Sequence, residues 1–166
     1  MGSNTPKPGD IKLRDISGPN GVPDGKISSE YDRTVIGSIQ PNFTYGFSTS
    51  LTYKNWDIYL SFFGSQGNKV YNLLRRYLEG RPNNSYNMSA ALLKAWTVDN
   101  PSQTIPRIDY TRPTELDSRF VENGSFLKLK NITVGYTFPM QISTSQFKFR
   151  VFAAGHNLLT ITKYKG

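Results

Sequence analysis

The sequence predicts an all-β fold, an antiparallel meander of about four strands that forms a segment of an outer-membrane type of β-barrel. Two observations support this prediction. Between residues 43 and 54, apolar side chains occupy every second position with one interruption at Thr49, so one strand face is aromatic and the other is small and polar. Short and long connections also alternate between the predicted strands, as turns and loops do in such barrels.

The first two predicted strands form the hairpin 43–64. The first strand spans 43–53, a turn follows at Lys54 and Asn55, and the second strand spans 56–64. Even positions of the second strand are apolar, whereas its odd positions are mixed. The first strand is close to the roughly 9–11 residues that cross a bilayer when tilted. The pattern therefore suggests a wall with lipid on one side and a watery lumen on the other.

The third and fourth predicted strands span 126–138 and 147–162. Two leucines near the start of the third strand fall out of phase with the apolar residues that alternate further along it. This slip at Lys130 and Asn131 indicates either a β-bulge or a strand that leaves the membrane and changes its buried face. Pro139 is expected to end the third strand.

The rest of the chain is predicted to be loop. Residues 1–42 form a loop region rich in Gly, Pro and Asp, and residues 43–166 form the barrel segment. Within that segment, residues 65–125 form a long, partly helical extracellular loop. Short helices are expected at 71–78 and 88–96, the second of them capped by a serine. The second helix either folds the loop onto itself or contacts a substrate.

The composition narrows the classes of protein that this chain can represent. The chain has 166 residues, no cysteine and one histidine, which removes disulfides, Cys-based zinc sites and multi-His metal sites. No catalytic motif is present, so no catalytic residue is assigned and an enzyme is not expected. The net charge of +8 comes from scattered basic residues without a basic helix, so nucleic acid is not an expected partner. A basic rim that contacts anionic lipopolysaccharide or an acidic substrate is the alternative.

Four sequence runs and one shorter segment are similar to a known family. The runs are DRTVIG at 32–37, PNFTYGF at 41–47, RFVENGSFLKLKNITVGYTFP at 119–139 and AGHNLLTITKYKG at 154–166, with the shorter segment at 96–101. In order and spacing they resemble the C-terminal part of the SusC/RagA family of TonB-linked outer-membrane transporters. The resemblance covers most of residues 9–166 and rests on no single motif.

The resemblance implies a role in nutrient uptake across the bacterial outer membrane. Family members form a barrel of about 22 strands with a plug in the lumen, and they import oligosaccharides or peptides in Bacteroidetes. A SusD-like surface lipoprotein caps them, and the TonB complex supplies energy through the N-terminal part. The implied partners are therefore the remainder of the parent barrel and plug, the SusD-like lipoprotein, the TonB complex and outer-membrane lipid.

Several parts of the family pattern lie outside the match. The plug, the TonB box, the signal peptide and a closing strand after Gly166 have no counterpart in the chain. The smallest barrels have about eight strands, so four strands cannot close one. We therefore expect the chain to be a fragment that is not transport-competent alone.

Carboxylates between residues 15 and 32 are similar to part of a calcium loop. Family members often carry Asp-x-Asn-x-Asp-Gly-x-Ile here, and calcium requires about six to eight oxygen ligands. The weak candidate ligands in this chain are Asp15, Asp24, Glu30 and Asp32. Asn20 and Val22 occupy the first two ligand positions, so a metal-free or weakly binding loop is favoured and no cofactor is expected.

Aromatic residues form two candidate groups. The predicted lipid-interface aromatics, which lie near the short turns, are Tyr53, Trp56 and Phe138. The candidate substrate-binding residues are the aromatics of the long loop, Tyr71, Tyr77, Tyr86, Trp96 and Tyr110. These loop rings either stack on carbohydrate or pack the loop itself. His156 is expected to be a polar lumen residue without special chemistry.

Two other interpretations remain open at this point. A secreted, soluble β-sandwich would recognise glycans through its loop aromatics and would bury both aromatic faces. A calcium-stabilised structural module would depend on the loop at 15–32. The barrel and the sandwich differ in solution, because a barrel segment exposes a lipid face and unpaired strand edges to water, whereas a sandwich does not.

Overall fold

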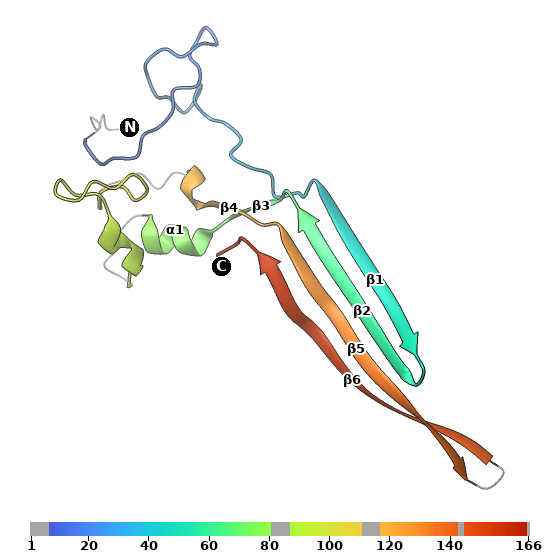
Figure 1. Ribbon diagram of the computed structural model, residues 1–166. Helices are drawn as coiled ribbons and strands as arrows, with labels where there is room; N and C mark the ends of the chain where they lie inside the picture. Colours follow the sequence, from blue (N-terminus) through green and yellow to red (C-terminus); the bar gives the residue numbers. More distant parts are fainter. Residues whose placement is uncertain (1–6, 81–86, 111–116, 143–144, 166) are drawn as a thin grey trace. The chain divides into compact units, whose positions relative to one another are not determined.

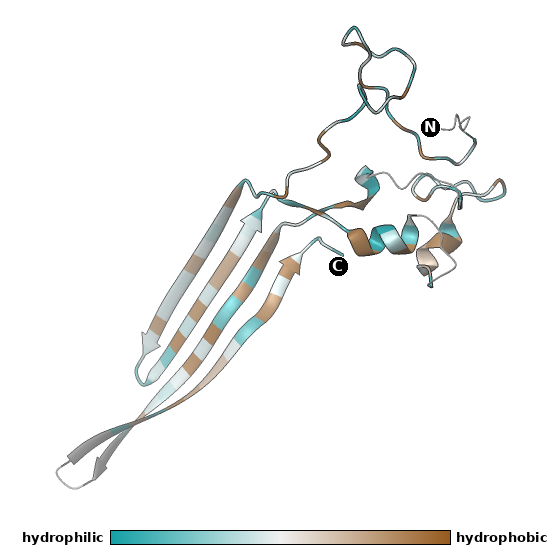
Figure 2. Cartoon of the chain, turned by 180° about the vertical axis from the view of Figure 1, so that it is seen from behind, coloured by the Kyte–Doolittle hydropathy of each residue, from teal (hydrophilic) through white to brown (hydrophobic). Residues whose placement is uncertain are grey.

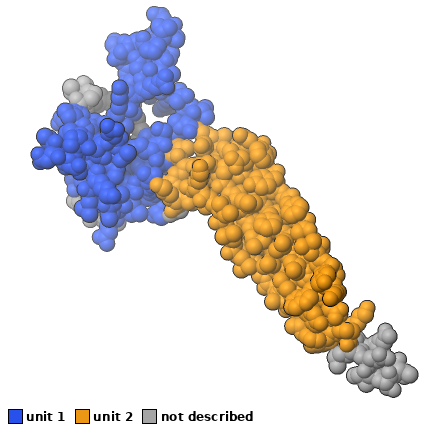
Figure 3. Space-filling view, in the orientation of Figure 1, with its two compact units in different colours: residues 1–36, 72–120 blue, residues 37–71, 121–166 orange. Residues whose placement is uncertain are grey.

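The computed structural model describes residues 7–80, 87–110, 117–142 and 145–165, which fall into two compact units (Figure 1, Figure 3). Unit 1 comprises residues 1–36 and 72–120, and unit 2 comprises residues 37–71 and 121–166. The elements in chain order are β1 (Phe43–Tyr53), β2 (Trp56–Gln66), β3 (Lys69–Tyr71), α1 (Leu73–Glu79), the 3₁₀ helices η1 (Ala90–Lys94) and η2 (Ser118–Phe120), β4 (Val121–Asn123), β5 (Phe126–Ile142) and β6 (Ser145–Thr162).

Unit 2 is built on a four-stranded antiparallel sheet with the strand order β1-β2-β5-β6. This arrangement confirms the predicted meander of four strands. The hairpin pairs Phe43 with Gln66 at one end and Tyr53 with Trp56 at the other, so β2 extends two residues beyond its predicted end. A separate ribbon pairs β3 with β4 inside the region predicted to be loop.

The register of β5 contains a β-bulge at the predicted slip. Ser61 of β2 pairs with Asn131 of β5. The next residue of β2, Phe62, pairs with Leu129, so Lys130 is an extra residue in β5. The extra residue shifts the phase of the strand and brings its early leucines onto the same face as its later apolar residues. Of the two interpretations of the slip, the bulge is correct.

The paired strands give the sheet one apolar and one polar face, and Figure 2 shows the resulting alternation of hydropathy along each strand. The apolar face includes, strand by strand, Phe47 and Leu51, then Ile58 and Leu60, then Leu129, Ile132 and Val134, and finally Val151, Leu159 and Ile161. The polar face includes Thr44, Ser48, Ser50, Thr52, Asp57, Ser61, Lys128, Asn131, Thr133, Arg150, His156 and Thr160. Among the described paired residues of the apolar face, none is charged.

The apolar face of the sheet is open. Phe47, Phe149 and Ile161, which belong to different parts of this face, are each more than half exposed. Among the described residues, the buried apolar ones are Ala95 and Phe120, both in unit 1. Covering a Phe, Leu or Ile side chain contributes about 1.5–3 kcal/mol. This face therefore requires an apolar environment that the chain does not supply in unit 2.

Pro139 does not end β5, contrary to the prediction, because the strand continues past it and pairs it with Lys148 of β6. The ladder between β2 and β5 has already ended at that point. The N–H of Thr137 donates to the carbonyl of Asn55 at 2.8 Å, so the nitrogen of Pro139, two residues on, faces the same side beyond the end of β2. Proline is tolerated there because no ladder hydrogen bond is required on that side.

Helix α1 is shorter than the helix predicted at 71–78. Its N-cap is Asn72, whose side chain accepts a hydrogen bond from the N–H of Arg75 at 2.9 Å. Tyr71 consequently belongs to β3 rather than to the helix. Among the helices in the described ranges, none has the length and apolar character required to cross a membrane.

The helix predicted at 88–96 is a short 3₁₀ helix, η1. Ser89 caps it as predicted, because its hydroxyl accepts a hydrogen bond from the N–H of Ala91 at 3.2 Å. The helix stops early because Ala95 is extended. The N–H of Trp96 then donates to the carbonyl of Ile105 at 3.0 Å, which ties the chain into the loop instead of a further helical turn.

Deleting Lys130 tests the bulge. Without the extra residue, one part of β5 must turn its apolar side chains to the polar face, so we expect the intact protein to lose its folded, protease-resistant form in detergent micelles. Lys130→Ser keeps the residue count and is the matched control, which should fold normally. Equal protease resistance of the deletion and the control would contradict the structural role of the bulge.

Candidate functional site

An ion pair on the polar face connects β2 with β6 across β5. Arg150 donates from Nε and Nη2 to the two carboxylate oxygens of Asp57, at 2.9 and 2.5 Å. Gly135 of β5 lies between them, and a Cβ there would lie 2.5 Å from Arg150 Nη2 and 2.6 Å from Asp57 Oδ1. The pair is partly exposed, so it contributes little energy by itself. The bidentate geometry of the pair nevertheless favours one register of β2, β5 and β6. Glycine at position 135 leaves space for the two side chains, which a Cβ would occupy.

A second polar contact lies at the bulge. His156 of β6 pairs with Asn131 of β5, and its Nδ1 lies 2.6 Å from Asn131 Oδ1. The register between β5 and β6 shifts beside this pair, where Asn157 adopts a positive φ of 54°. The histidine therefore lies on the polar face, and its placement toward a lumen stays a prediction.

The predicted interface aromatics lie together on the apolar face beside the turn of the hairpin. Tyr53 pairs with Trp56, and Phe138 lies two residues beyond Tyr136 on the same face of β5. Tyr136 lies 4.9 Å from Trp56 and 4.6 Å from Phe138 between ring centroids, and Phe149 extends the row from Phe138 at 6.3 Å. We call these five residues the aromatic belt. Two members of the belt, Tyr136 and Phe149, were not predicted from the sequence, because their place beside Trp56 and Phe138 depends on the pairing of β2, β5 and β6.

The predicted substrate-binding aromatics lie in different elements. Tyr71 is in β3 of unit 2, whereas Tyr77 in α1 and Tyr110 belong to unit 1 and are 50% and 58% exposed. Tyr86 lies outside the described residues. Trp96 packs against Gly9, where a Cβ would collide with the indole ring. Trp96 thus has a packing role, and Tyr77 and Tyr110 are the described members of the group with the most accessible rings.

A cluster that the sequence analysis did not identify surrounds Phe120, which is 2% exposed. The guanidinium groups of Arg75 and Arg119 lie 5.8 and 4.8 Å from the centre of its ring. Arg75 also donates to Glu79 at 2.8 Å, and Arg119 donates to Asp117 at 2.9 Å. This cluster anchors η2 to α1 within unit 1.

The carboxylates of the 15–32 loop bind backbone N–H groups. Asp32 accepts from Ile16 at 2.8 Å, from Ser17 at 3.3 Å and from Ser28 at 2.7 Å. These donors, above all the N–H of Ser28, hold the pKa of Asp32 below its ordinary value. Asp32 therefore closes the loop by joining its two ends.

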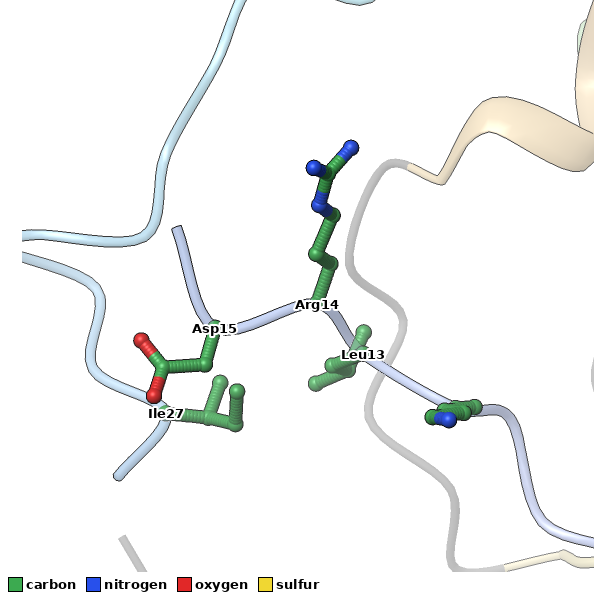
Figure 4. A pocket seen from close by; sticks show the side chains of 5 residues that line it. Leu13, Arg14, Asp15 and Ile27 are labelled. Atoms are coloured by element: carbon green, nitrogen blue, oxygen red, sulfur yellow. The ribbon is translucent and has the colours of Figure 1, made fainter. Parts of the chain in front are cut away.

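The other candidate ligands do not converge on a metal site. Asp15 accepts from the N–H of Gly25 at 2.6 Å, Asp24 accepts from Lys26 at 2.9 Å, and Glu30 is exposed. A shallow pocket near Asp15 is lined by Lys12, Leu13, Arg14, Asp15 and Ile27 (Figure 4). One oxygen of Asp15, Oδ1, is buried without a hydrogen-bond partner among the described residues, but these residues contain no group of three potential metal ligands. The metal-free or weakly binding loop therefore stays a prediction, and the described contacts of these carboxylates are to backbone N–H groups.

Arg107 joins two loop segments of unit 1. Its Nε lies 2.5 Å from Asp10 Oδ1, and its Nη2 lies 2.8 Å from Asp109 Oδ2. Its backbone N–H also donates to the carbonyl of Gly9 at 2.8 Å. The hydrogen bond to Asp10, with the charge of both carboxylates, raises the pKa of Arg107. The segment around Gly9 is thereby attached to the loop that contains Trp96.

The sheet of unit 2 has the features of a β-barrel wall. It combines a continuous apolar face without paired charged residues, a polar face rich in hydroxyl groups, and an aromatic belt at the end with the short turn. Membrane barrels alternate side chains in this way, with an outward apolar band and flanking aromatic girdles. The fold therefore defines a segment of a membrane β-barrel.

Known proteins support a narrower assignment. The TonB-dependent receptors P3 and P26 of Formosa agariphila are each 35% identical to the chain, over 96% and 95% of its length. The TonB-dependent receptor SusC of Bacteroides thetaiotaomicron is 32% identical over 73% of the chain. The chain spans 15%, 16% and 12% of these three relatives. No family model matches the chain.

Solved structures agree with the sequence relatives. The RagAB peptide transporter superimposes with a TM-score of 0.74 at 31% identity, covering 92% of this chain and 17% of the other. The open-open state of the RagAB peptide importer gives a TM-score of 0.71 at 29% identity, covering 89% and 16%. The chain is a SusC/RagA-like segment of the TonB-dependent receptors, which confirms the resemblance found in the sequence. The names of these relatives describe receptors and transporters rather than enzymes.

Gly135→Ala tests the ion pair across β5. The added methyl group would displace Arg150 or Asp57, so we expect the intact protein to lose about 1–3 kcal/mol of stability, measured by urea unfolding in detergent. Gly46→Ala is the matched control, because a Cβ there meets only the carbonyl oxygen of Phe62, at 3.6 Å. Equal midpoints for the two variants would show that Gly135 is not required.

Asp32→Asn tests the closure of the 15–32 loop. The amide can no longer accept from all the N–H groups that Asp32 binds, so we expect hydrogen exchange at Ile16 and Ser28 to become severalfold faster at neutral pH. Asp24→Asn, which loses one local bond to Lys26, is the control and should change this exchange little.

The same loop should respond to acid. Because the folded-state pKa of Asp32 is depressed, its contribution is complete above the unfolded-state pKa of about 3.8 and is lost as the pH falls through the folded-state value. The protection of these amides, taken as the measured exchange rate relative to the intrinsic rate at each pH, should therefore fall in the wild-type loop toward that of the Asp32→Asn variant in acid. Protection that is unchanged in acid, or an equal effect of the two variants, would contradict this role.

Proposed function

We propose that the chain forms part of the barrel wall of a TonB-dependent outer-membrane transporter that imports oligosaccharides or peptides. The observation that carries this proposal is the apolar face, which stays continuous across four strands because the bulge at Lys130 corrects its phase. Such a face is favourable against lipid and costly against water. The relatives named above support the class of transporter.

In this proposal the two faces of the sheet have separate roles. The apolar face contacts outer-membrane lipid, the aromatic belt lies at the headgroup level beside the short turn, and the polar face lines the lumen. The edge strands β1 and β6 pair with the remainder of the parent barrel, since unpaired edges would otherwise associate. The long connection between β2 and β5 is proposed to be extracellular.

The long connection is also proposed to meet the partners of the transporter. Tyr77 and Tyr110, with their accessible rings, are the described residues best suited to contact substrate or a SusD-like lipoprotein. The TonB complex acts through a plug outside this chain. By itself the chain does not transport, because four strands leave the barrel open.

A soluble β-sandwich is less well supported. A sandwich needs a second sheet of similar size against the aromatic face. Among the described residues, the only other sheet is the β3–β4 ribbon, whose strands have three residues each, whereas β5 and β6 have 17 and 18. The ribbon is too small to cover the apolar face.

Light scattering of the purified chain, with and without detergent, tests the proposal. We expect aggregation in buffer and relief of aggregation in micelles, because the exposed apolar face and the strand edges find partners in water. A compact, cooperatively unfolding monomer in plain buffer would refute the barrel wall and favour the soluble module.

A further inference from the structure

The polar face carries an unexpected group of aromatic rings near the start of β5. Most side chains of this face are small or hydroxylated, but Phe63 of β2, which is 41% exposed, belongs to it. Two other aromatic residues of this face, Tyr59 and Phe152, lie further along the sheet, and the Phe152 ring lies under the guanidinium of Arg150. Phe126 of β5 belongs to the same face, and its ring centroid lies 5.9 Å from that of Phe63. Lys128, which pairs with Phe63, has its Nζ 5.9 Å from the centre of the Phe126 ring. We call Phe63, Phe126 and Lys128 the aromatic–lysine cluster.

The space beside this cluster is open. Gly46 of β1 pairs with Phe63, and a Cβ at Gly46 would meet only the carbonyl oxygen of Phe62, at 3.6 Å. The Phe63 ring therefore borders free volume on the polar face, where a ligand group can pack against it. Apolar side chains that lie together and partly exposed on an otherwise polar face can mark an interaction site.

The charge around the cluster favours an anion. Asp57 is the acidic residue among the described paired residues of the polar face, and it is neutralised by Arg150 at the far end. No described paired residue of this face opposes the charge of Lys128 with a carboxylate. A carboxylate presented beside the rings would thus meet a lysine, and no acidic residue among the described paired residues of this face would compete with it.

We propose that the aromatic–lysine cluster is a contact site for an acidic peptide, in which an aromatic or aliphatic side chain packs on Phe63 and Phe126 and a carboxylate pairs with Lys128. This inference rests on the proposed function, in which substrate passes along the polar face. The planes of the two rings are inclined by 53°, so the rings do not form one flat surface for a sugar ring. Inclined rings can instead contact two sides of a peptide side chain. A neutral sugar would also leave the lysine without a partner, whereas an acidic peptide uses both features.

Binding to the intact receptor tests the site by calorimetry. The probes are a heptapeptide of alternating glutamate and phenylalanine and its counterpart with glutamine in place of glutamate. Lys128→Gln should weaken binding of the acidic peptide about tenfold and leave the glutamine peptide unchanged. Lys148→Gln, which removes a lysine from the same face opposite Pro139, is the matched control and should change neither affinity.

Two further variants test the rings and the open space. Phe63→Ser should weaken both peptides, because it removes the apolar contact that they share. Gly46→Leu fills the volume beside Phe63 without a backbone clash and should weaken both peptides as well. Equal effects of Lys128→Gln and Lys148→Gln, or unchanged affinities in Phe63→Ser and Gly46→Leu, would overturn the proposal.

Accessibility supplies an independent test. The chain has no cysteine, so Phe63→Cys introduces one thiol into this segment. We expect a water-soluble maleimide to label it in the intact receptor and the acidic peptide to slow the labelling. A thiol that is shielded without peptide would show that another part of the receptor covers the cluster, and would overturn the proposal. A chain that proves to be a soluble monomer refutes the barrel wall itself, whereas a receptor that binds both peptides alike in every variant refutes only this site.

Discussion

The structure depends on the hydrogen-bonded register of β5 between β2 and β6. Because side chains alternate along a strand, a slip of one residue exchanges the two faces of the sheet. The extra residue Lys130 makes this exchange once, at a defined place, and so joins two apolar stretches of opposite phase into one face. A sheet without the bulge would carry apolar and polar patches on both sides and would fit neither lipid nor water.

The contacts of the polar face follow from the same register. Asp57 and Arg150 meet across β5 only because Gly135 lies between them, and His156 reaches Asn131 only beside the bulge. Directly opposed residues bring their Cβ atoms to roughly 4.5–5.5 Å, so each register creates its own set of side-chain pairs. The aromatic–lysine cluster is another product of this pairing, since Phe63 and Lys128 come from different strands.

The surroundings of the sheet stabilise it in a different way from a protein core. The apolar content of the chain is 37%, which is modest. The reason is that each long strand carries its apolar residues mainly on one face. The aromatic belt places rings at one end of that side, which in the proposed barrel is the level where lipid meets water. In unit 1, by contrast, an apolar side chain is buried within the unit itself, since Phe120 lies between the side chains of Arg75 and Arg119.

The sequence by itself determined the four long strands, their faces and the place of the register slip, because alternation and its interruption are local properties of the chain, but it did not reveal β3 and β4. The same alternation places Tyr53, Trp56 and Phe138 on the apolar face, and their role at a membrane interface stays a prediction. Local patterns gave wrong element ends where contacts between distant segments determine the structure. Pro139 stays in β5 because β2 ends before it, and η1 is short because Trp96 bonds to Ile105.

Only the tertiary structure decided which strands pair and which side chains meet across them. Asp57 and Arg150 are 93 residues apart in the sequence, and the local sequence around either residue does not predict the ion pair between them. The carboxylates of the 15–32 loop likewise gave a metal-like spacing, yet backbone N–H groups occupy them in the folded loop. The physical reason is common to both cases. A side chain's partner depends on strand order and loop closure, which arise from pairing between segments that are distant in the sequence.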